Sequence, residues 1–136
     1  MQYFLAKTDP DTYPIDKFEQ DKKTCWEGVR NAQAVKSIQA MMPGDKVFMY
    51  HSMGQVAIMG MAKVISTPRP DPNDVKSWVV DLEYLHRTDP PTTLREIKEC
   101  GLFADWSLVR QSRLSTMAAP EKFVIWMRAR YPKLKL

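Results

Sequence analysis

Two neighbouring apolar runs limit the possible folds of this chain more than any other feature. Residues 45–51 and 55–67 are rich in Val, Ile, Phe and Met, and the segment between them, Ser52-Met53-Gly54, is able to turn. Two strand-like runs joined by a short segment with glycine predict an antiparallel hairpin. We therefore expect two adjacent strands in a sheet here.

Shorter elements surround this hairpin without a regular alternation of strand and helix. Strands are expected at residues 3–7, 78–85 and 114–118, and helices at 14–20, from a cap at Asn31 to about 41, at 94–99 after Thr92 or Thr93, and at 120–130. The proline-rich stretch 68–74 is unsuited to a helix or a central strand, so a surface loop is predicted. This order indicates an α+β fold with a curled, barrel-like sheet and polar loops at its rim.

The composition is that of an ordinary folded protein. The 136 residues are 44% hydrophobic and 26% charged, which predicts one domain over residues 1–136. Cys25 and Cys100 lie far apart in the sequence, which argues against a disulfide framework and fits a reducing compartment. Without a signal-peptide pattern or an apolar run of ~20 residues, we expect a cytoplasmic protein, monomeric and without a membrane segment. The net charge of +4 is compatible with phosphate contacts but decides nothing.

The segment Trp26-Glu27-Gly28-Val29-Arg30-Asn31 joins a large aromatic face, a cation and an amide within six residues. Tryptophan and arginine can stack on a nucleobase, and asparagine can both donate to and accept from a base edge, so the segment suggests base recognition. A structural interpretation competes with this one. Trp26 can be a core residue, and Asn31 can cap a helix.

Two further polar segments offer groups for a ligand. Tyr50-His51-Ser52 ends a predicted strand, and Arg110-Gln111-Ser112-Arg113-Leu114-Ser115 precedes another. Neighbouring strand residues face opposite sides, so His51 is badly placed to act as a base for Ser52, and ligand binding or plain turn polarity is favoured. The guanidinium groups of Arg110 and Arg113 suit phosphate or a base edge, although arginines at strand ends are often only solvated.

No pattern predicts a metal or a cofactor. The candidate ligands Cys25, His51, His86 and Cys100 form no close pair, and no glycine-rich phosphate loop occurs. The acids near 9–11 and 71–74 lie in proline-rich stretches where carboxylates usually serve turns. The basic C-terminal segment with Arg128, Arg130 and Lys133 can attract a phosphate backbone, or it can be the cationic end of a helix.

Four motifs, in their order and spacing, closely resemble the EVE domain family. They are Lys7-Thr8-Asp9-Pro10-Asp11-Thr12-Tyr13, the segment from Trp26 to Asn31, Gly44-Asp45 followed by Tyr50-His51-Ser52, and Arg110 to Ser115. The resemblance implies a PUA-like mixed β pseudo-barrel with short helices around it. It also implies a cleft for a modified nucleobase, such as 5-methylcytosine or 5-hydroxymethylcytosine in DNA, or a modified base in RNA.

The resemblance also implies a role for individual residues. Trp26 would stack on the base, Asn31, Tyr50 and Ser52 would contact its edge, Lys7 and Arg113 would meet polar or charged groups, and Ser115 would close the wall. His51 and Arg110 belong to the same base-binding set. Arg30, Arg128, Arg130 and Lys133 are the candidates for backbone phosphates.

Three functions stay open at this point. The first is a non-enzymatic nucleic-acid-binding domain that reads a modified base. The second is an enzyme acting on nucleic acid or a nucleoside through His51, Lys7 and Arg113 in the same cleft. The third is a protein-interaction module that uses the proline-rich loop at 68–72. Residue types alone do not decide the modification, the choice between DNA and RNA, or the strandedness.

Overall fold

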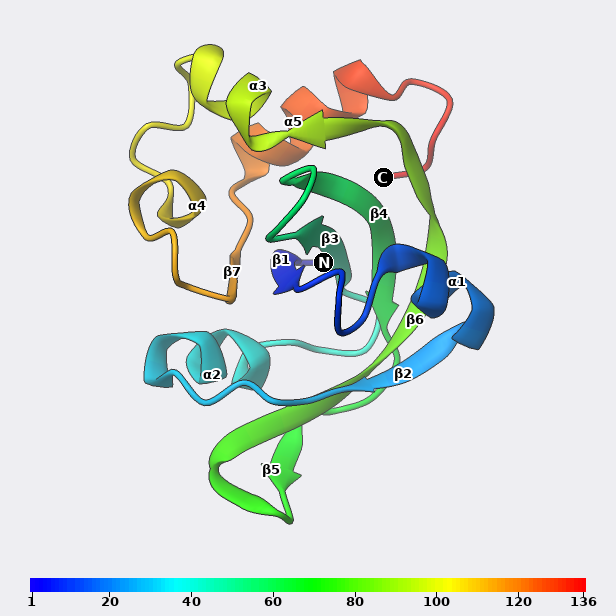
Figure 1. The fold of residues 1–136 in the computed structure, drawn as a ribbon, viewed down its shortest axis with the longest axis vertical. Coiled ribbons are helices and arrows are strands. Elements are labelled where there is room, and N and C mark those ends of the chain that lie inside the picture. The colour runs from blue at the N-terminus through cyan, green and yellow to red at the C-terminus, as the bar shows by residue number, and fades with distance from the viewer.

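The computed structural model describes residues 1–136 and is built on one mixed seven-stranded sheet (Figure 1). The order across the sheet is β2-β6-β4-β3-β1-β7, and β5 pairs with β6 beside this path. The strands are β1 (Tyr3–Thr8), β2 (Lys23–Trp26), β3 (Lys46–His51), β4 (Ala57–Val64), β5 (Arg69–Asp71), β6 (Asp74–Thr93) and β7 (Thr116–Ala118).

The predicted hairpin is confirmed as the antiparallel pair β3 and β4, with Lys46 opposite Lys63 and His51 opposite Ala57. The first strand, β1, lies on the other side of β3 and runs parallel to it, so that Lys7 is opposite Tyr50. Because parallel strands end at the same edge of a sheet, this pairing brings two of the four polar motifs together.

Five helices accompany the sheet, and four of them match the predicted positions within about two residues. They are α1 (Ile15–Asp21), α2 (Ala32–Gln39), α3 (Leu94–Glu99), α4 (Ser107–Arg110) and α5 (Glu121–Arg130). Asn31 caps α2 as predicted. Thr93 caps α3 in a capping box with Glu96, in which each side chain bonds the other residue's backbone N–H.

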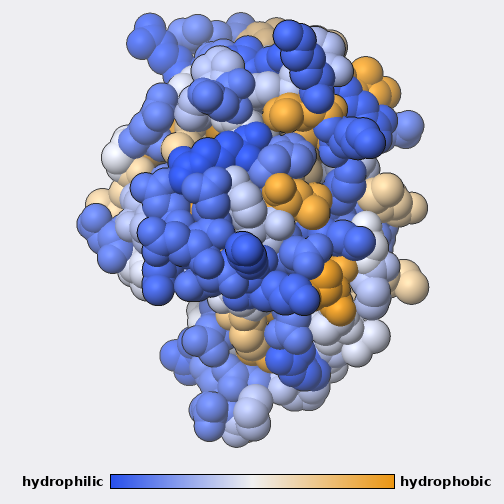
Figure 2. Space-filling view, turned by 90° about the vertical axis from the view of Figure 1, so that its right-hand side faces the viewer, coloured by the Kyte–Doolittle hydropathy of each residue, from blue (hydrophilic) through white to orange (hydrophobic).

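The sheet curls but does not close, because its terminal strands β2 and β7 do not pair with each other. Helix α2 contacts both β6 and β7 and lies across the gap between these two sides of the sheet (Figure 1). The predicted α+β class with a curled sheet is confirmed, and the sheet is open. The surface to the right of Figure 1 is mainly hydrophilic, with small separate apolar areas (Figure 2).

A single cluster of 32 buried residues includes side chains of the sheet and of all five helices. On one side, α1 packs closely against the sheet at Gly60. A Cβ atom at this position would lie 2.9 Å from the carbonyl oxygen of His86 and 3.0 Å from Cδ1 of Ile15. Ile15 is the first residue of α1, and its backbone N–H donates to Nε2 of His51 at 3.0 Å. Gly60 and His51 therefore fix where α1 begins.

Two strands differ from the predictions. Strand β2 was not predicted, because Lys23, Thr24 and Cys25 lack an apolar alternation, as befits a strand that lies largely on the surface. Strand β6 continues past residue 85 through Pro90 and Pro91. The two prolines are tolerated because they fall in an irregularity of the β4–β6 ladder, where they have no partner in the register.

The proline-rich stretch 68–74 is a surface feature, as expected, but it is not all loop. It contains the short strand β5, which pairs with β6 in an arm at the foot of Figure 1. Proline is compatible with this edge position. Helix α4 was also not predicted, because it is a single turn of four residues. No helix of the chain is long and apolar enough to span a membrane.

Candidate functional site

A cleft of about 430 Å³ lies where the end of β1, the loop before α1, strand β2 and the start of the β7 segment meet. This volume is within the usual range for small-ligand sites and is sufficient for one substituted aromatic ring. Twelve residues line it: Lys7, Thr8, Asp9, Thr12, Tyr13, Thr24, Cys25, Trp26, Glu27, Gly28, Val29 and Ser115.

Two aromatic rings form part of the cleft wall. Tyr13 and Trp26 lie edge to face, with ring centroids 6.3 Å apart and planes inclined by 73°. The hydroxyl of Tyr13 donates to Oδ2 of Asp21 at 2.9 Å. Burial raises the pKa of Tyr13, so it remains a neutral donor near pH 7. Trp26 is only 8% exposed and also belongs to the core, so it combines the structural role with a place in the cleft wall.

Lys7 is the central cation of the cleft. Its Nζ donates to the backbone carbonyl of Ser112 at 3.0 Å and lies 5.5 Å from the centroid of the Tyr50 ring. No carboxylate lies within ion-pair distance of Lys7, and burial lowers its pKa. Its backbone N–H donates to the carbonyl of Ser115 at 2.8 Å. Lys7 thereby joins the cleft to the loop before β7.

A second, shallower hollow of about 310 Å³ lies beside this loop. It is lined by Asn31, Arg110, Gln111, Ser112, Arg113 and Leu114. Oδ1 of Asn31 accepts from the backbone N–H groups of Gln33 and Ala34 at 3.0 and 3.1 Å, which leaves its amide nitrogen free to donate. Six of the nine predicted base-binding residues are thus divided between two depressions: Lys7, Trp26 and Ser115 line the cleft, and Asn31, Arg110 and Arg113 line the hollow.

The model of the EVE domain family matches residues 2–129, which is nearly the whole chain. The chain belongs to the EVE domain family. Mouse thymocyte nuclear protein 1 is 31% identical over 124 residues, which cover 71% of this chain and 55% of that protein. Human thymocyte nuclear protein 1 is 39% identical over 81 residues, covering 51% and 36%. The chain therefore spans between about a third and about half of these relatives.

Solved structures resemble this EVE domain over its full length. Rpa0253 from Rhodopseudomonas palustris has a TM-score of 0.90 at 30% identity, covering 100% of this chain and 97% of that one. Human THYN1 protein, in a complex with DNA that contains 5-methylcytosine, has a TM-score of 0.88 at 20% identity, covering 99% and 100%. Both likenesses support the fold.

Within this EVE domain, the Tyr50-His51-Ser52 motif supports the cleft from behind and does not line it. Tyr50 is 2% exposed, and burial raises its pKa to about 12. His51 borders a small cavity behind Tyr13 and Trp26, and burial lowers its pKa although the charge of Asp16 opposes this. Ser52 is exposed, and both its backbone N–H and its Oγ donate to the carbonyl of Thr8, at 2.9 and 3.2 Å.

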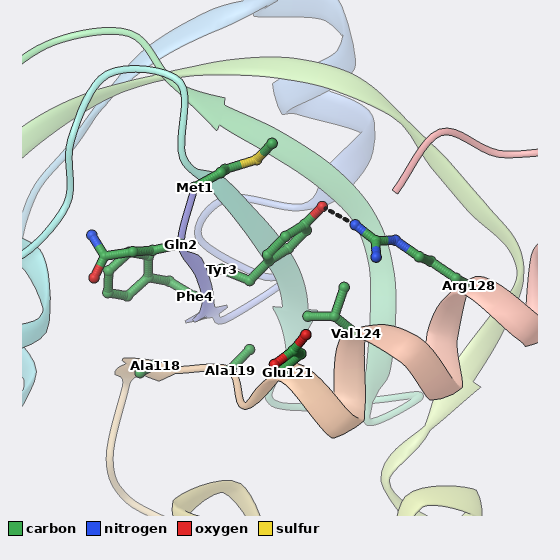
Figure 3. A pocket seen from close by; sticks show the side chains of 9 residues that line it. All are labelled: Met1, Gln2, Tyr3, Phe4, Ala118, Ala119, Glu121, Val124 and Arg128. Atoms are coloured by element: carbon green, nitrogen blue, oxygen red, sulfur yellow. Dashed lines mark hydrogen bonds between the residues drawn. The ribbon is translucent and has the colours of Figure 1, made fainter.

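Three predicted phosphate contacts already have partners inside the protein. Arg30 Nε pairs with Asp74 Oδ2 at 2.9 Å, which ties the segment after β2 to the β5–β6 arm. Arg130 bonds Glu96 and donates to Thr92 Oγ1. Arg128 donates to the Tyr3 hydroxyl at 2.9 Å beside a separate groove of about 510 Å³ (Figure 3). Lys133 is exposed in the segment after α5.

Several cleft residues were not singled out from the sequence. Tyr13, Thr24 and Glu27 line the cleft beside Trp26, but none of these three was among the predicted base-binding residues. Tyr13 and Glu27 lie inside two of the four motifs, so the motif boundaries were the available signal. Thr24 carried no signal, because its strand was not predicted. No group of three or more His, Cys, Asp or Glu side chains is arranged to hold a metal ion.

Proposed function

We propose that this EVE domain binds nucleic acid and reads one modified base in the cleft beside Trp26. The observation that carries the proposal is the combination of the Tyr13–Trp26 aromatic pair with the unpaired cation Lys7 in one cleft. A base withdrawn from its stack presents a flat apolar face and a polar edge, and a binding site has to satisfy both. The aromatic rings serve the face, and the polar wall serves the edge.

The polar groups of the cleft favour a base with an exocyclic amine, such as cytosine. A carboxylate accepts well from the N4 amino group of cytosine, and the exposed Glu27 makes no ion pair. The hydroxyls of Thr12 and Thr24 add groups that can both donate and accept. Modified cytosine is therefore the first ligand to test, in DNA and then in RNA.

The bound DNA in the human THYN1 structure carries 5-methylcytosine, which supports the same ligand class for this chain. One methyl group that fits closely in a binding pocket contributes about 1–3 kcal/mol of binding free energy, so discrimination between methylated and plain cytosine should be moderate. In this proposal Lys7, Trp26 and Ser115 contact the base from the cleft wall, and Asn31, Arg110 and Arg113 contact the ligand from the adjoining hollow. Tyr50, His51 and Ser52 support the cleft from behind.

We propose binding without catalysis. His51, the strongest candidate for a general base, does not line the cleft, and its Nε2 already accepts from the backbone N–H of Ile15. Ser52 donates its hydroxyl to a backbone carbonyl. Both arrangements support a structural use of these side chains. A monomeric, cytoplasmic protein that comprises one domain over residues 1–136 and uses no cofactor completes the proposal.

The test is a titration of labelled oligonucleotides followed by fluorescence anisotropy at fixed salt. The strands carry cytosine, 5-methylcytosine, 5-hydroxymethylcytosine or N6-methyladenine at one position, in DNA and RNA. We expect one modified strand to bind about 10-fold more tightly than the plain strand. Trp26→Phe, which keeps an apolar ring in the core, should reduce this preference. Trp78→Phe on the β5–β6 arm is the matched control and should preserve it.

Equal binding of every strand, with affinity that falls steeply as salt rises, would contradict base reading and leave only backbone electrostatics. Turnover of a strand that disappears in His51→Ala would instead favour an enzyme.

A further inference from the structure

The arginines of this protein fall into two groups according to their partners. Of the eight arginines in the chain, five make ion pairs with carboxylates, and Arg128 bonds the Tyr3 hydroxyl and the carbonyl of Leu136. The five paired residues are Arg30, Arg69, Arg87, Arg95 and Arg130. Only Arg110 and Arg113 have guanidinium groups that bond nothing in the protein, and both line the hollow beside the loop before β7.

The surroundings of this hollow suit an anion. None of its six lining residues is acidic, so no carboxylate of its own wall neutralises the two guanidinium groups. The free amide nitrogen of Asn31 and the side chains of Gln111 and Ser112 add hydrogen-bond donors. Guanidinium groups match phosphate oxygens in geometry as well as charge, because the planar fork can donate two parallel bonds.

The hollow is directly connected to the cleft. Nζ of Lys7, which lines the cleft, donates to the backbone carbonyl of Ser112, which lines the hollow, at 3.0 Å. The backbone N–H of Lys7 also donates to the carbonyl of Ser115, next to the last residue of the hollow. A base in the cleft and a group in the hollow would thus be neighbours along one ligand.

We propose that Arg110 and Arg113 in the hollow bind a backbone phosphate next to the base that is held in the cleft. This inference rests on the proposed function and narrows it. The ligand is then a modified nucleotide within a strand, because a free base or nucleoside would leave both guanidinium groups without a partner. Arg110 and Arg113 contribute affinity that is independent of the base, and the cleft contributes the selectivity.

The test couples one phosphate to the two arginines. A strand with a single 5-methylcytosine is made with an uncharged methylphosphonate at the linkage on its 5′ side or on its 3′ side. Each strand is titrated with the wild-type protein and with Arg110→Gln/Arg113→Gln. The matched control is Arg95→Gln/Lys98→Gln, which removes two exposed charges from α3, a helix that lines neither the hollow nor the cleft.

We expect one of the two methylphosphonates to weaken wild-type and control binding about 10-fold, and binding by the Arg110→Gln/Arg113→Gln protein less than about 2-fold. The losses of binding free energy from removing that phosphate charge and from removing the two arginines should therefore not be additive. The preference for 5-methylcytosine over cytosine should persist in the arginine variant, because the base is read elsewhere.

If each methylphosphonate weakens binding of the wild-type protein and of the arginine variant by the same factor, the proposed phosphate site is contradicted, while base reading is unaffected. Non-additive effects of the methylphosphonate and the arginine substitutions, without any preference for the modified base, would support the phosphate site and contradict the proposed reading of a modified base. Absence of binding to every strand would overturn both.

Discussion

Two pairs of arginines, Arg128 with Arg130 and Arg110 with Arg113, differ in their surroundings far more than in their sequence. Arg128 and Arg130 lie on the last turn of α5, and Arg130 bonds Glu96 and Thr92 while it stacks near Trp126 and Tyr131. Arg110 and Arg113 lie beside the cleft and bond nothing. Arg130 links α5 to α3 and Arg128 links α5 to β1, whereas Arg110 and Arg113 remain available to a ligand. Partners, and not charge, therefore distinguish structural arginines from binding arginines.

The largest expected effect contrasts one arginine of each pair in stability. Arg130→Gln removes charge-assisted hydrogen bonds to Glu96 and Thr92, so we expect the free energy of unfolding to fall by about 1–2 kcal/mol. Arg113→Gln, which breaks no internal bond, should change it by less than about 0.5 kcal/mol. Urea denaturation of both variants measures this contrast. Similar losses of unfolding free energy in the two variants would contradict the distinction between structural and binding arginines.

A smaller effect concerns the pH dependence of the α3–α5 contact. Burial tends to raise the pKa of Glu96, but the Thr93 backbone N–H, the charge of Arg130 and side-chain hydrogen bonds together lower it below its ordinary value of 4.5. A carboxyl whose pKa is lower in the folded state stabilises the fold above its unfolded pKa, and this stabilisation is lost as the pH falls through its folded pKa.

Stability should therefore decrease as the pH falls below about 4.5, and it should decrease less in Arg130→Gln. Urea midpoints measured between pH 3 and pH 7 provide the comparison. Glu19, whose pKa is lowered mainly by its hydrogen bond to Arg87, titrates in the same range and will preserve part of the slope. An identical slope in both proteins would assign the pH dependence to groups other than Glu96.

The smallest expected effect is at Lys7, on the cleft side of the comparison. Burial lowers the pKa of Lys7, which means that the folded protein disfavours its charged form. Lys7→Met keeps the apolar stem and removes the charge, so stability should stay the same or rise by less than about 1 kcal/mol, while oligonucleotide affinity falls. Thermal unfolding and the same anisotropy titration check both parts. A clear loss of stability would make Lys7 a structural residue.

Much of the fold follows from local patterns in the sequence, and the misses have local causes. The β3–β4 hairpin, the Asn31 cap and the Thr93 cap were predictable because apolar spacing and capping chemistry involve residues close in the sequence. Strand β2 was missed because two of its four residues are exposed and it has no apolar alternation. The predicted β6 was too short because its prolines fall where the ladder is irregular.

The cleft was less predictable, because its composition depends on contacts between distant segments. The four motifs identified Lys7, Trp26 and Ser115, which line one cleft, but they did not reveal that Tyr50 and His51 are buried behind it. Nor did they show which arginines are occupied. Arg130 finds Glu96 on another helix, and no rule of sequence spacing anticipates that partner. The extent of the domain and the role of each site residue stay predictions.

The tight contact at Gly60 gives the cleft a hidden dependence on a residue that never touches it. Any larger side chain there would press on Ile15, and Ile15 is both the start of α1 and the donor to His51. The loop that carries Thr12 and Tyr13 leads directly into that helix. A larger residue at position 60 would therefore displace the start of α1 and the loop that leads into it, and so would change the shape of a cleft that Gly60 does not line.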